Sequence, residues 1–375
     1  FDFLLSNPPF GVEWKTQQKA VTAEHEQRGH AGRFGPGLPR VSDGSLLFLL
    51  HLISKMRPVR NPDDKGSRIA IVLNGSPLFT GGAGSGESNI RQWIIENDLL
   101  DAIIALPTDM FYNTGIATYM WILDNHKPVE RRGKVQLIDA TGRWTKLRKN
   151  LGSKNREISD SDRELIVKLY DEFTDTDESK ILEPADFGYW EITVEQPLRL
   201  RFEVTAEDTD AALALKPVLK LHESDQHAVR TALLSLTGKV WTNRDEFVKA
   251  LRLAIKAAGT TVGTPVIKAL WQSIGERDES ADICTDAKGN IEPDTDLRDT
   301  ELVPFRDTID DYFTREVTPH VPDAWIDHSK TKVGYEIPFT RLFYKYVPPR
   351  PIEEIDAELN VLAGEIIDLL QAVEG

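Results

Sequence analysis

Short apolar runs alternate with longer amphipathic segments along the first half of the chain. The runs whose density of Val, Ile, Leu and Phe predicts buried strands are 1–5, 67–74, 99–107, 116–124 and 133–140. The segments whose apolar spacing predicts helices are 45–56, 87–97 and 159–173. Strands that alternate with helices are typical of an α/β domain with a mostly parallel sheet. Such sheets bind ligands beyond the carboxyl ends of their strands.

The segments between these elements differ in character. Residues 22–44 are rich in Gly and polar side chains without periodicity, which predicts a long loop that is either functional or disordered. The Gly-rich stretch 79–88 follows a predicted strand, but its glycines lack the spacing of a phosphate-binding loop, so we expect a surface turn. The apolar spacing of residues 205–275 predicts helices, and this region is acidic. No motif indicates a role for residues 205–300.

The C-terminal segment repeats apolar side chains at alternating steps of three and four. The positions of this seam are Ile352, Ile355, Leu359, Leu362, Ile366, Leu369 and Val373. Three heptads with acidic residues on the outer faces are typical of a coiled-coil helix, and Pro351 marks its start. We expect a helix that docks onto another subunit, and a last helix packed on its own domain is the alternative.

Charge and cysteine content narrow the class of protein. The chain of 375 residues has a net charge of −15, but residues 1–150 carry 19 Lys and Arg against 15 Asp and Glu, so the acidity lies in the remainder. This division suggests a site that meets a polyanion and a body that meets protein partners. Basic clusters at 131–134 and 143–149 are candidates for phosphate contacts. The single cysteine, Cys284, and the absence of an apolar run of about 18 residues favour a cytoplasmic protein without membrane contact.

The motif with the clearest chemistry is Asn7-Pro8-Pro9-Phe10, directly after the first predicted strand. Two prolines fix φ and remove backbone donors, so the turn is stiff and its carbonyls are free to accept hydrogen bonds. The amino group of a flat base could donate its two hydrogens to the Asn7 side-chain oxygen and the Pro8 carbonyl, while Phe10 stacks on the ring. The lone pair of that amine would then face an electrophilic methyl group.

The tetrapeptide resembles the [DNS]-P-P-[YFW] motif of amino-methyltransferases that use S-adenosylmethionine. Further segments occur in an order that resembles the methylation (M) subunits of type I restriction-modification systems, an N6-adenine DNA methyltransferase family. They include "GSRIAIVLNGSPLF", "IRQWIIENDLLDAIIALPTDMFYNTGIATYMWILDN", "DFGYWEITVEQPLRL" and "EIPFTRLFYKYVPPRPIEEIDAEL". The resemblance spans most of the chain and is least diagnostic between about 205 and 300.

This resemblance implies roles for particular residues. The catalytic motif would comprise Asn7, Pro8, Pro9 and Phe10. Phe111, or the adjacent Tyr112, would place a second aromatic ring against the flipped base, and a core position is the alternative for Phe111. The resemblance further implies double-stranded DNA as substrate, no metal, and assembly with a specificity (S) subunit, a second M subunit and a restriction (R) subunit.

The same resemblance shapes our expectations for cofactor and domains. In the family, the Gly-rich loop that binds S-adenosylmethionine lies upstream of the tetrapeptide, so we expect the chain to be the C-terminal part of a longer protein and inactive alone. Residues 1–145 would complete a Rossmann-like methyltransferase domain, 146–345 would be mixed and then mainly helical, and 346–375 would be the docking helix. Two other functions stay open: a non-catalytic assembly module, and a methyltransferase acting on RNA or protein glutamine.

Overall fold

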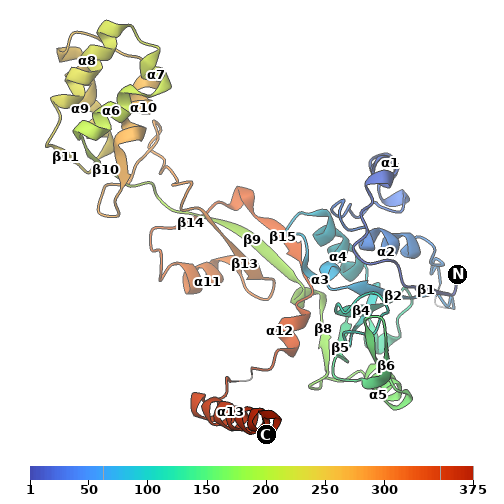
Figure 1. Cartoon of the computed structure of the whole chain (residues 1–375). Helices are drawn as coiled ribbons and strands as arrows, with labels where there is room; N and C mark the ends of the chain where they lie inside the picture. Colours follow the sequence, from blue (N-terminus) through green and yellow to red (C-terminus); the bar gives the residue numbers. More distant parts are fainter. Residues whose placement is uncertain (62, 347, 375) are drawn as a thin grey trace.

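The computed structural model describes residues 1–61, 63–346 and 348–374. It arranges them as a larger sheet, a smaller sheet, a helical unit and a long C-terminal helix (Figure 1). The larger sheet carries the N-terminus, and the helical unit stands at the far end of the smaller sheet. In this described part of the chain, no helix is both long and apolar enough to cross a bilayer.

Within the described residues, the larger sheet has six strands in the order β1-β2-β4-β3-β5-β8. Their bounds are Phe3–Ser6 (β1), Arg68–Asn74 (β2), Leu100–Leu106 (β3), Thr118–Asp124 (β4), Val135–Asp139 (β5) and Ser179–Leu182 (β8). The four runs predicted between 67 and 140 are therefore confirmed as strands. β8 extends the sheet beyond residue 145, where we expected the catalytic part to end, because it pairs with β5.

The larger sheet is mixed: the predicted parallel direction holds for β1, β2, β3 and β5, whereas β4 and β8 run the other way. β1 runs parallel to β2 and β3 runs parallel to β5, whereas β4 is antiparallel to both β2 and β3. The connection from β3 to β4 contains no helix, and a parallel pairing would need a crossover of a dozen or more residues, usually helical. The chain therefore turns back directly and places β4 between β2 and β3.

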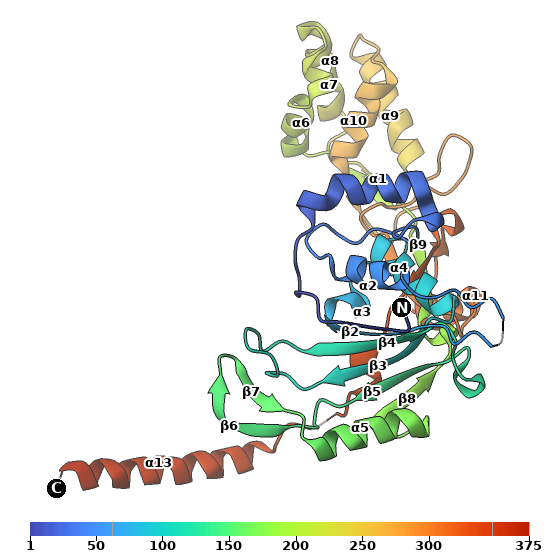
Figure 2. The same ribbon diagram turned by 90° about the vertical axis from the view of Figure 1, so that its right-hand side faces the viewer.

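Helices cover both faces of the larger sheet (Figure 2). Their bounds are Gln18–Arg28 (α1), Ser45–Ile53 (α2), Ser76–Phe79 (α3), Gly86–Glu96 (α4) and Asp160–Glu172 (α5), with 3₁₀ turns at Lys15–Gln17, Gly29–Ala31, Val129–Arg131 and Pro184–Asp186. On one face, Leu49 of α2 and Ile94 of α4 join a core with Ile71 of β2. On the other face, Ile166 of α5 packs with Ile138 of β5.

Among the described residues β1 stands at one end of the strand order, so the strand predicted for residues 1–5 is confirmed at Phe3–Ser6 but is only partly buried. Leu4 points into the core, but Phe3 and Leu5 are 75% and 81% exposed. Among the described residues β1 pairs with β2 alone, and the helices of one face cover only the side that carries Leu4. The sheet therefore presents an apolar surface at this edge.

Residues 22–44 are not a loop throughout, because α1 occupies the first part of them. None of the side chains of α1 is buried, so the helix has no apolar stripe that periodicity could detect. An ion pair of 2.5 Å joins Glu24 of α1 to Arg33, and His25 Nδ1 lies 2.7 Å from the backbone oxygen of Phe34. The hydrogen bonds from Arg33 lower the pKa of Glu24 to about 2. Local polar contacts and the partly buried Val21, which packs against the first core, hold this helix in place.

The smaller sheet is built around β9, and a helical unit interrupts it. The strands are Gly188–Glu195 (β9), Asp299–Pro304 (β13), Trp325–Ile326 (β14) and Lys332–Tyr335 (β15), and the last three pair antiparallel with β9. Short helical segments accompany them at Ile309–Tyr312 (α11), Phe313–Val317 (a π-helical turn) and His328–Lys330 (a 3₁₀ turn). The unit between β9 and β13 has its own core, in which Phe202 and Phe247 stack at 4.4 Å.

The helical unit confirms the helices predicted for residues 205–275. They are Ala206–Leu213 (α6), Lys216–Leu219 (α7), Glu223–Leu234 (α8), Arg244–Ala257 (α9) and Thr264–Ile274 (α10). A small sheet at the base comprises Leu200–Glu203 (β10), Val240–Trp241 (β11) and Gly275–Arg277 (β12). The spacing of apolar residues predicted these helices correctly because each long helix buries one stripe of apolar side chains in this core.

The chain returns from the smaller sheet to the core of the larger one before it ends. Ile337, which precedes α12 (Phe339–Phe343), and Phe339, its first residue, are buried in the first core. α13 (Ile352–Glu374) follows and projects away from both sheets (Figure 1). The predicted C-terminal helix is therefore present, and it begins directly after Pro351 as expected.

Candidate functional site

The predicted tetrapeptide lies at the edge of the larger sheet where β1, β2 and β3 end and β4 begins. Asn7 follows directly on β1, which runs parallel to β2. Asn74, the last residue of β2, pairs with Thr118, the first residue of β4. Thr118 also pairs with Leu106 at the end of β3. The carboxyl ends of three strands thus meet at one edge, the place where α/β sheets bind ligands.

Three polar side chains lie at this edge. Asn7 follows the last residue of β1 and belongs to the turn, so strand alternation does not assign it a face. Asn74 and Thr118 are paired neighbours in β2 and β4, so their side chains lie on one face. The Oδ1 atom of Asn74 and the Oγ1 atom of Thr118 are buried without a hydrogen-bond partner among the described residues. Buried polar atoms normally have a partner, so this edge is suited to a polar ligand.

The two prolines anchor the turn while Asn7 stays accessible. Pro8 is buried, whereas Asn7 and Pro9 are exposed. Gly11 adopts a left-handed conformation with φ of 60°, which lets the chain reverse immediately after the tetrapeptide. Trp14 then fixes the returning chain, since its indole N–H donates to a backbone oxygen at 2.9 Å. The amide of Asn7 is therefore presented to solvent from a stiff, well-anchored turn.

Phe10 and Phe111 lie against each other. Their ring centroids are 5.7 Å apart and their planes meet at 82°, an edge-to-face contact. Tyr112 is 61% exposed, and the Nζ atom of Lys154 lies 5.6 Å from the centre of its ring. The structure thus brings Phe111 to the tetrapeptide and leaves Tyr112 in solvent. The role of either ring toward a base stays a prediction.

Sequence reasoning missed Asn74 and Thr118. Asn74 ends a buried strand, where polar side chains commonly belong to a site, and this position is the signal that could have identified it. Thr118 gave no signal of its own. Only the insertion of β4 between β2 and β3 places its hydroxyl at this edge.

The Gly-rich stretch 79–88 is held in place by Arg91 of α4. The side chain of Arg91 is 1% exposed and donates, at 2.6 to 3.1 Å, to the backbone oxygens of Pro77, Thr80, Gly81 and Tyr335. Burial lowers the pKa of Arg91 to about 10. A Cβ atom added at Gly86 would collide with the backbone oxygen of Leu38. The two ends of the stretch are thus packed, whereas Gly82 and Gly84 between them are exposed, as expected of a surface turn.

Arg131 is buried, so the phosphate contact predicted for it is wrong. It is 5% exposed and donates to Asp101 at 2.8 Å and to Gln136 at 2.9 Å. Its guanidinium lies 4.2 Å from the ring centres of both Tyr170 and Phe173. The hydroxyl of Tyr170 also donates to Asp101, and burial together with this bond raises the pKa of Tyr170. Arg131 therefore joins β3, β5 and α5 in a structural network.

The apolar seam of α13 is exposed in the described structure. The exposed fractions of its described members range from 37% at Ile355 to 70% at Ile352. The side chain of Val373 lies outside the described residues. The alternative of a last helix whose seam packs on its own domain therefore does not hold for the seam residues that the structure describes.

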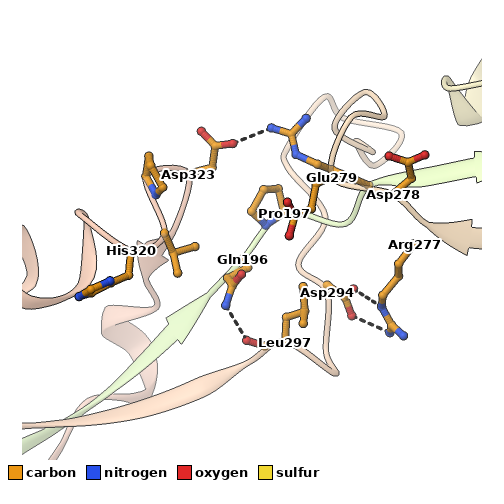
Figure 3. Close-up of a pocket in the computed structure, with 12 residues that line it drawn as sticks. Gln196, Pro197, Arg277, Asp278, Glu279, Asp294, Leu297, His320 and Asp323 are labelled. Atoms are coloured by element: carbon orange, nitrogen blue, oxygen red, sulfur yellow. Dashed lines mark hydrogen bonds and ion pairs between the residues drawn. The ribbon is translucent and has the colours of Figure 1, made fainter.

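A hollow of about 360 Å³ lies at the junction of the smaller sheet and the helical unit (Figure 3). Its arginines are paired, Arg199 with Asp323 at 2.6 Å and Arg277 with Asp294 at 2.5 Å. The side chain of Gln196 donates to a backbone oxygen across the hollow at 3.1 Å. Because these charged and polar side chains already have hydrogen-bond or ion-pair partners within the protein, we interpret the hollow as a structural contact between the smaller sheet and the helical unit, not as a ligand site.

Comparison with known proteins places the first half of the chain in a family. Residues 1–188 match the model of a family described as N-6 DNA methylase. Two methylase subunits of type I restriction enzymes from Methanocaldococcus jannaschii are similar. The MjaVIII subunit is 31% identical over 156 residues, which cover 41% of this chain and 26% of that protein. The MjaVII subunit is 36% identical over 174 residues, which cover 46% of this chain and 28% of that protein. The matched part thus spans about a quarter of the length of these relatives.

Solved structures give matches of the same kind. The methyltransferase subunit of a type I restriction-modification system from Streptococcus thermophilus is 28% identical, with a TM-score of 0.40, over 49% of this chain and 34% of that chain. A modification subunit of a putative type I restriction enzyme from Vibrio vulnificus is 16% identical, with a TM-score of 0.36, and the match covers 48% of this chain and 33% of that chain.

Proposed function

The chain belongs to the N-6 DNA methylase family, and from this premise we propose that the protein is the methylation subunit of a type I restriction-modification enzyme. Its reaction would transfer a methyl group from S-adenosylmethionine to the N6 atom of adenine in DNA. The observation that carries this proposal is the position of Asn7 to Phe10 at the carboxyl edge of the sheet, with Phe111 against Phe10. The similar methylase subunits support the same function.

The chemistry follows from what these residues can do with a flipped adenine. The Asn7 side-chain oxygen and the Pro8 carbonyl would accept the two hydrogens of the amino group, which fixes the amine and directs its lone pair. Phe10 would stack on the base, and Phe111 would support Phe10 through the edge-to-face contact. Bound S-adenosylmethionine supplies an electrophilic methyl group, and the protein contributes orientation for in-line transfer. We assign the Gly-rich stretch 79–88 no role in this chemistry, because its glycines lack the spacing of a phosphate-binding loop.

A transfer assay tests the proposed reaction. The full-length protein, purified with the subunits that accompany it, would be incubated with duplex DNA and S-adenosylmethionine carrying an isotopically labelled methyl group. The DNA would then be digested to nucleosides for mass spectrometry. We expect the label in N6-methyladenine. Label in RNA or in protein glutamine would favour the other methyltransferase functions, and no label in any of them would favour a non-catalytic assembly module.

Thr118→Val is expected to lower methyl transfer about tenfold and to change the free energy of unfolding by less than about 0.5 kcal/mol. The hydroxyl has no partner among the described residues, so the folded chain loses no hydrogen bond that they show, whereas a bound base or cofactor would lose one. Transfer rates and thermal denaturation check the two halves of this prediction. A large drop in stability with unchanged transfer would contradict it.

We also propose that α13 docks this chain onto a specificity subunit through its exposed seam. Changing Leu359 and Leu362 to Asp is expected to weaken subunit association by about a hundredfold or more, because it puts charges into a desolvated helix interface. The matched control changes Ala357 and Gly364, on the opposite side of the helix, to Asp. Sedimentation velocity of the assembled complex measures the effect. Equal behaviour of the two variants would exclude the seam, and loss of residues 351–375 should abolish the association.

A further inference from the structure

A strongly basic hairpin lies next to the candidate site. β6 (Thr145–Leu151) and β7 (Lys154–Glu157) form a separate two-stranded sheet that stands out from the larger one (Figure 2). Between Asp139 and Glu157 the chain carries six Lys and Arg and no Asp or Glu. In a chain with a net charge of −15, such a segment is the exception.

Three of these cations are available to a ligand. Lys146, Arg148 and Lys149 are exposed, and they have no ion pair or side-chain hydrogen bond with any residue that the structure describes. Arg143, by contrast, is paired with Glu178 at 2.5 Å. The hairpin therefore carries positive charge that the protein itself does not neutralise.

One free cation shares a side of the hairpin with an aromatic ring. Lys146 pairs with Arg156 across the two strands, so both side chains lie on one face, which we call the basic face. Arg148 follows two residues later, within the stretch between Lys146 and Leu151 where the pairing shifts register, so alternation does not assign it to a side. The guanidinium of Arg156 lies 4.1 Å from the centre of the Trp144 ring. Cations beside a stacked aromatic ring are the combination that nucleic-acid surfaces use.

The hairpin is fixed to the loop that carries Phe111. The backbone N–H of Ser153 donates to the oxygen of Tyr112 at 2.8 Å, and that of Asn155 donates to the oxygen of Asp109 at 3.0 Å. The side chain of Arg156 donates to Thr108 at 2.8 Å. These bonds bracket Phe111 on both sides, so the basic face keeps a fixed position relative to the candidate site.

We propose that the basic face with Lys146, together with the neighbouring exposed Arg148, binds the phosphates of the DNA strand that flanks the flipped nucleotide. This inference rests on the proposed function, because it names the part of the DNA that the same site must hold. A polyanion is the partner that matches unpaired cations, and phosphate contacts position a strand without reading its sequence. The face would anchor the strand while the adenine turns toward Asn7.

A salt titration of DNA binding tests this assignment. The full-length protein with its accompanying subunits would carry Lys146→Gln and Arg148→Gln together, and a matched control would carry Lys216→Gln and Lys220→Gln on the exposed side of α7. Fluorescence anisotropy with labelled duplex DNA would give the dissociation constant at several salt concentrations. We expect the hairpin variant to bind about tenfold more weakly at physiological salt, with a salt slope lower by about two. The control should match the unmodified protein.

The outcomes separate this inference from the proposed function. In transfer assays the hairpin variant should raise KM for DNA and leave kcat unchanged. If both double variants bind DNA equally well while the native assembly methylates adenine, the hairpin assignment is wrong and the proposed function stands. If the native assembly neither binds nor methylates DNA, the proposed function fails, and the hairpin assignment fails with it.

Discussion

Replacing Asn7 by alanine in the full-length protein is expected to lower methyl transfer by about a hundred- to a thousandfold. The change removes the side-chain oxygen that would hold one hydrogen of the target amine, so the lone pair is no longer directed at the methyl group. Asn7 is exposed, and its turn is anchored by the buried Pro8, so folding should be unaffected. Initial rates at saturating DNA and cofactor measure the effect.

Asn7→Asp is the informative companion, because it keeps an acceptor oxygen at the same position. The motif group that this tetrapeptide resembles also admits Asp, so this variant should retain far more activity than Asn7→Ala. Both variants should still assemble with the other subunits and bind DNA. Undiminished transfer by Asn7→Ala would show that the tetrapeptide is not catalytic.

Replacing Arg131 by alanine is expected to reduce the free energy of unfolding by about 3 to 5 kcal/mol. The change leaves the carboxylate of Asp101 buried without its cation, and it removes the guanidinium from between the rings of Tyr170 and Phe173. The neighbouring Arg132→Ala provides the matched control: that residue is exposed and loses one hydrogen bond, to the backbone oxygen of Lys127 at 3.1 Å, so the change should cost about 1 kcal/mol or less. Urea denaturation of both variants makes the comparison.

The triple variant Arg131→Met, Asp101→Leu, Tyr170→Phe should recover part of the lost stability, because a buried ion pair can often be replaced by apolar side chains and Tyr170→Phe removes the hydroxyl that Asp101 would no longer accept from. This recovery would show that the cost of the single change is an uncompensated charge. If Arg131→Ala were no more destabilising than Arg132→Ala, the buried network would contribute little to the fold.

Apolar patterning predicted the elements that bury a continuous stripe or run. β2 to β5, α2, α4, α5 and the helices of residues 205–275 lie where it placed them. It failed for α1, which buries no side chain, and it located β1 but not the exposure of Phe3 and Leu5 on that strand. It also could not give strand direction, because direction depends on whether a connection crosses over or turns back.

The candidate site was predicted in outline only. The tetrapeptide stood out because its chemistry is local, contained in four consecutive residues. Whether Phe111 or Tyr112 faces the tetrapeptide depends on the backbone conformation of the loop that carries them, which the sequence does not give. In this loop Asp109 adopts a left-handed conformation with φ of 59°. Arg131 looked identical to an exposed cation in the sequence, and only the packing of α5 on the sheet reveals that it is enclosed.

The helical unit has a consequence for the order in which the chain acquires its structure. Val194 and Asp299 are paired neighbours in β9 and β13, although the whole unit separates them. Closing a loop of roughly a hundred residues costs about 3 kcal/mol more conformational entropy than closing a tight turn. The folded unit removes most of this cost, since its ends already meet where Leu198 donates to the oxygen of Glu292 at 2.8 Å. The inserted unit should therefore fold first and act as the nucleus from which the β9–β13 ladder closes.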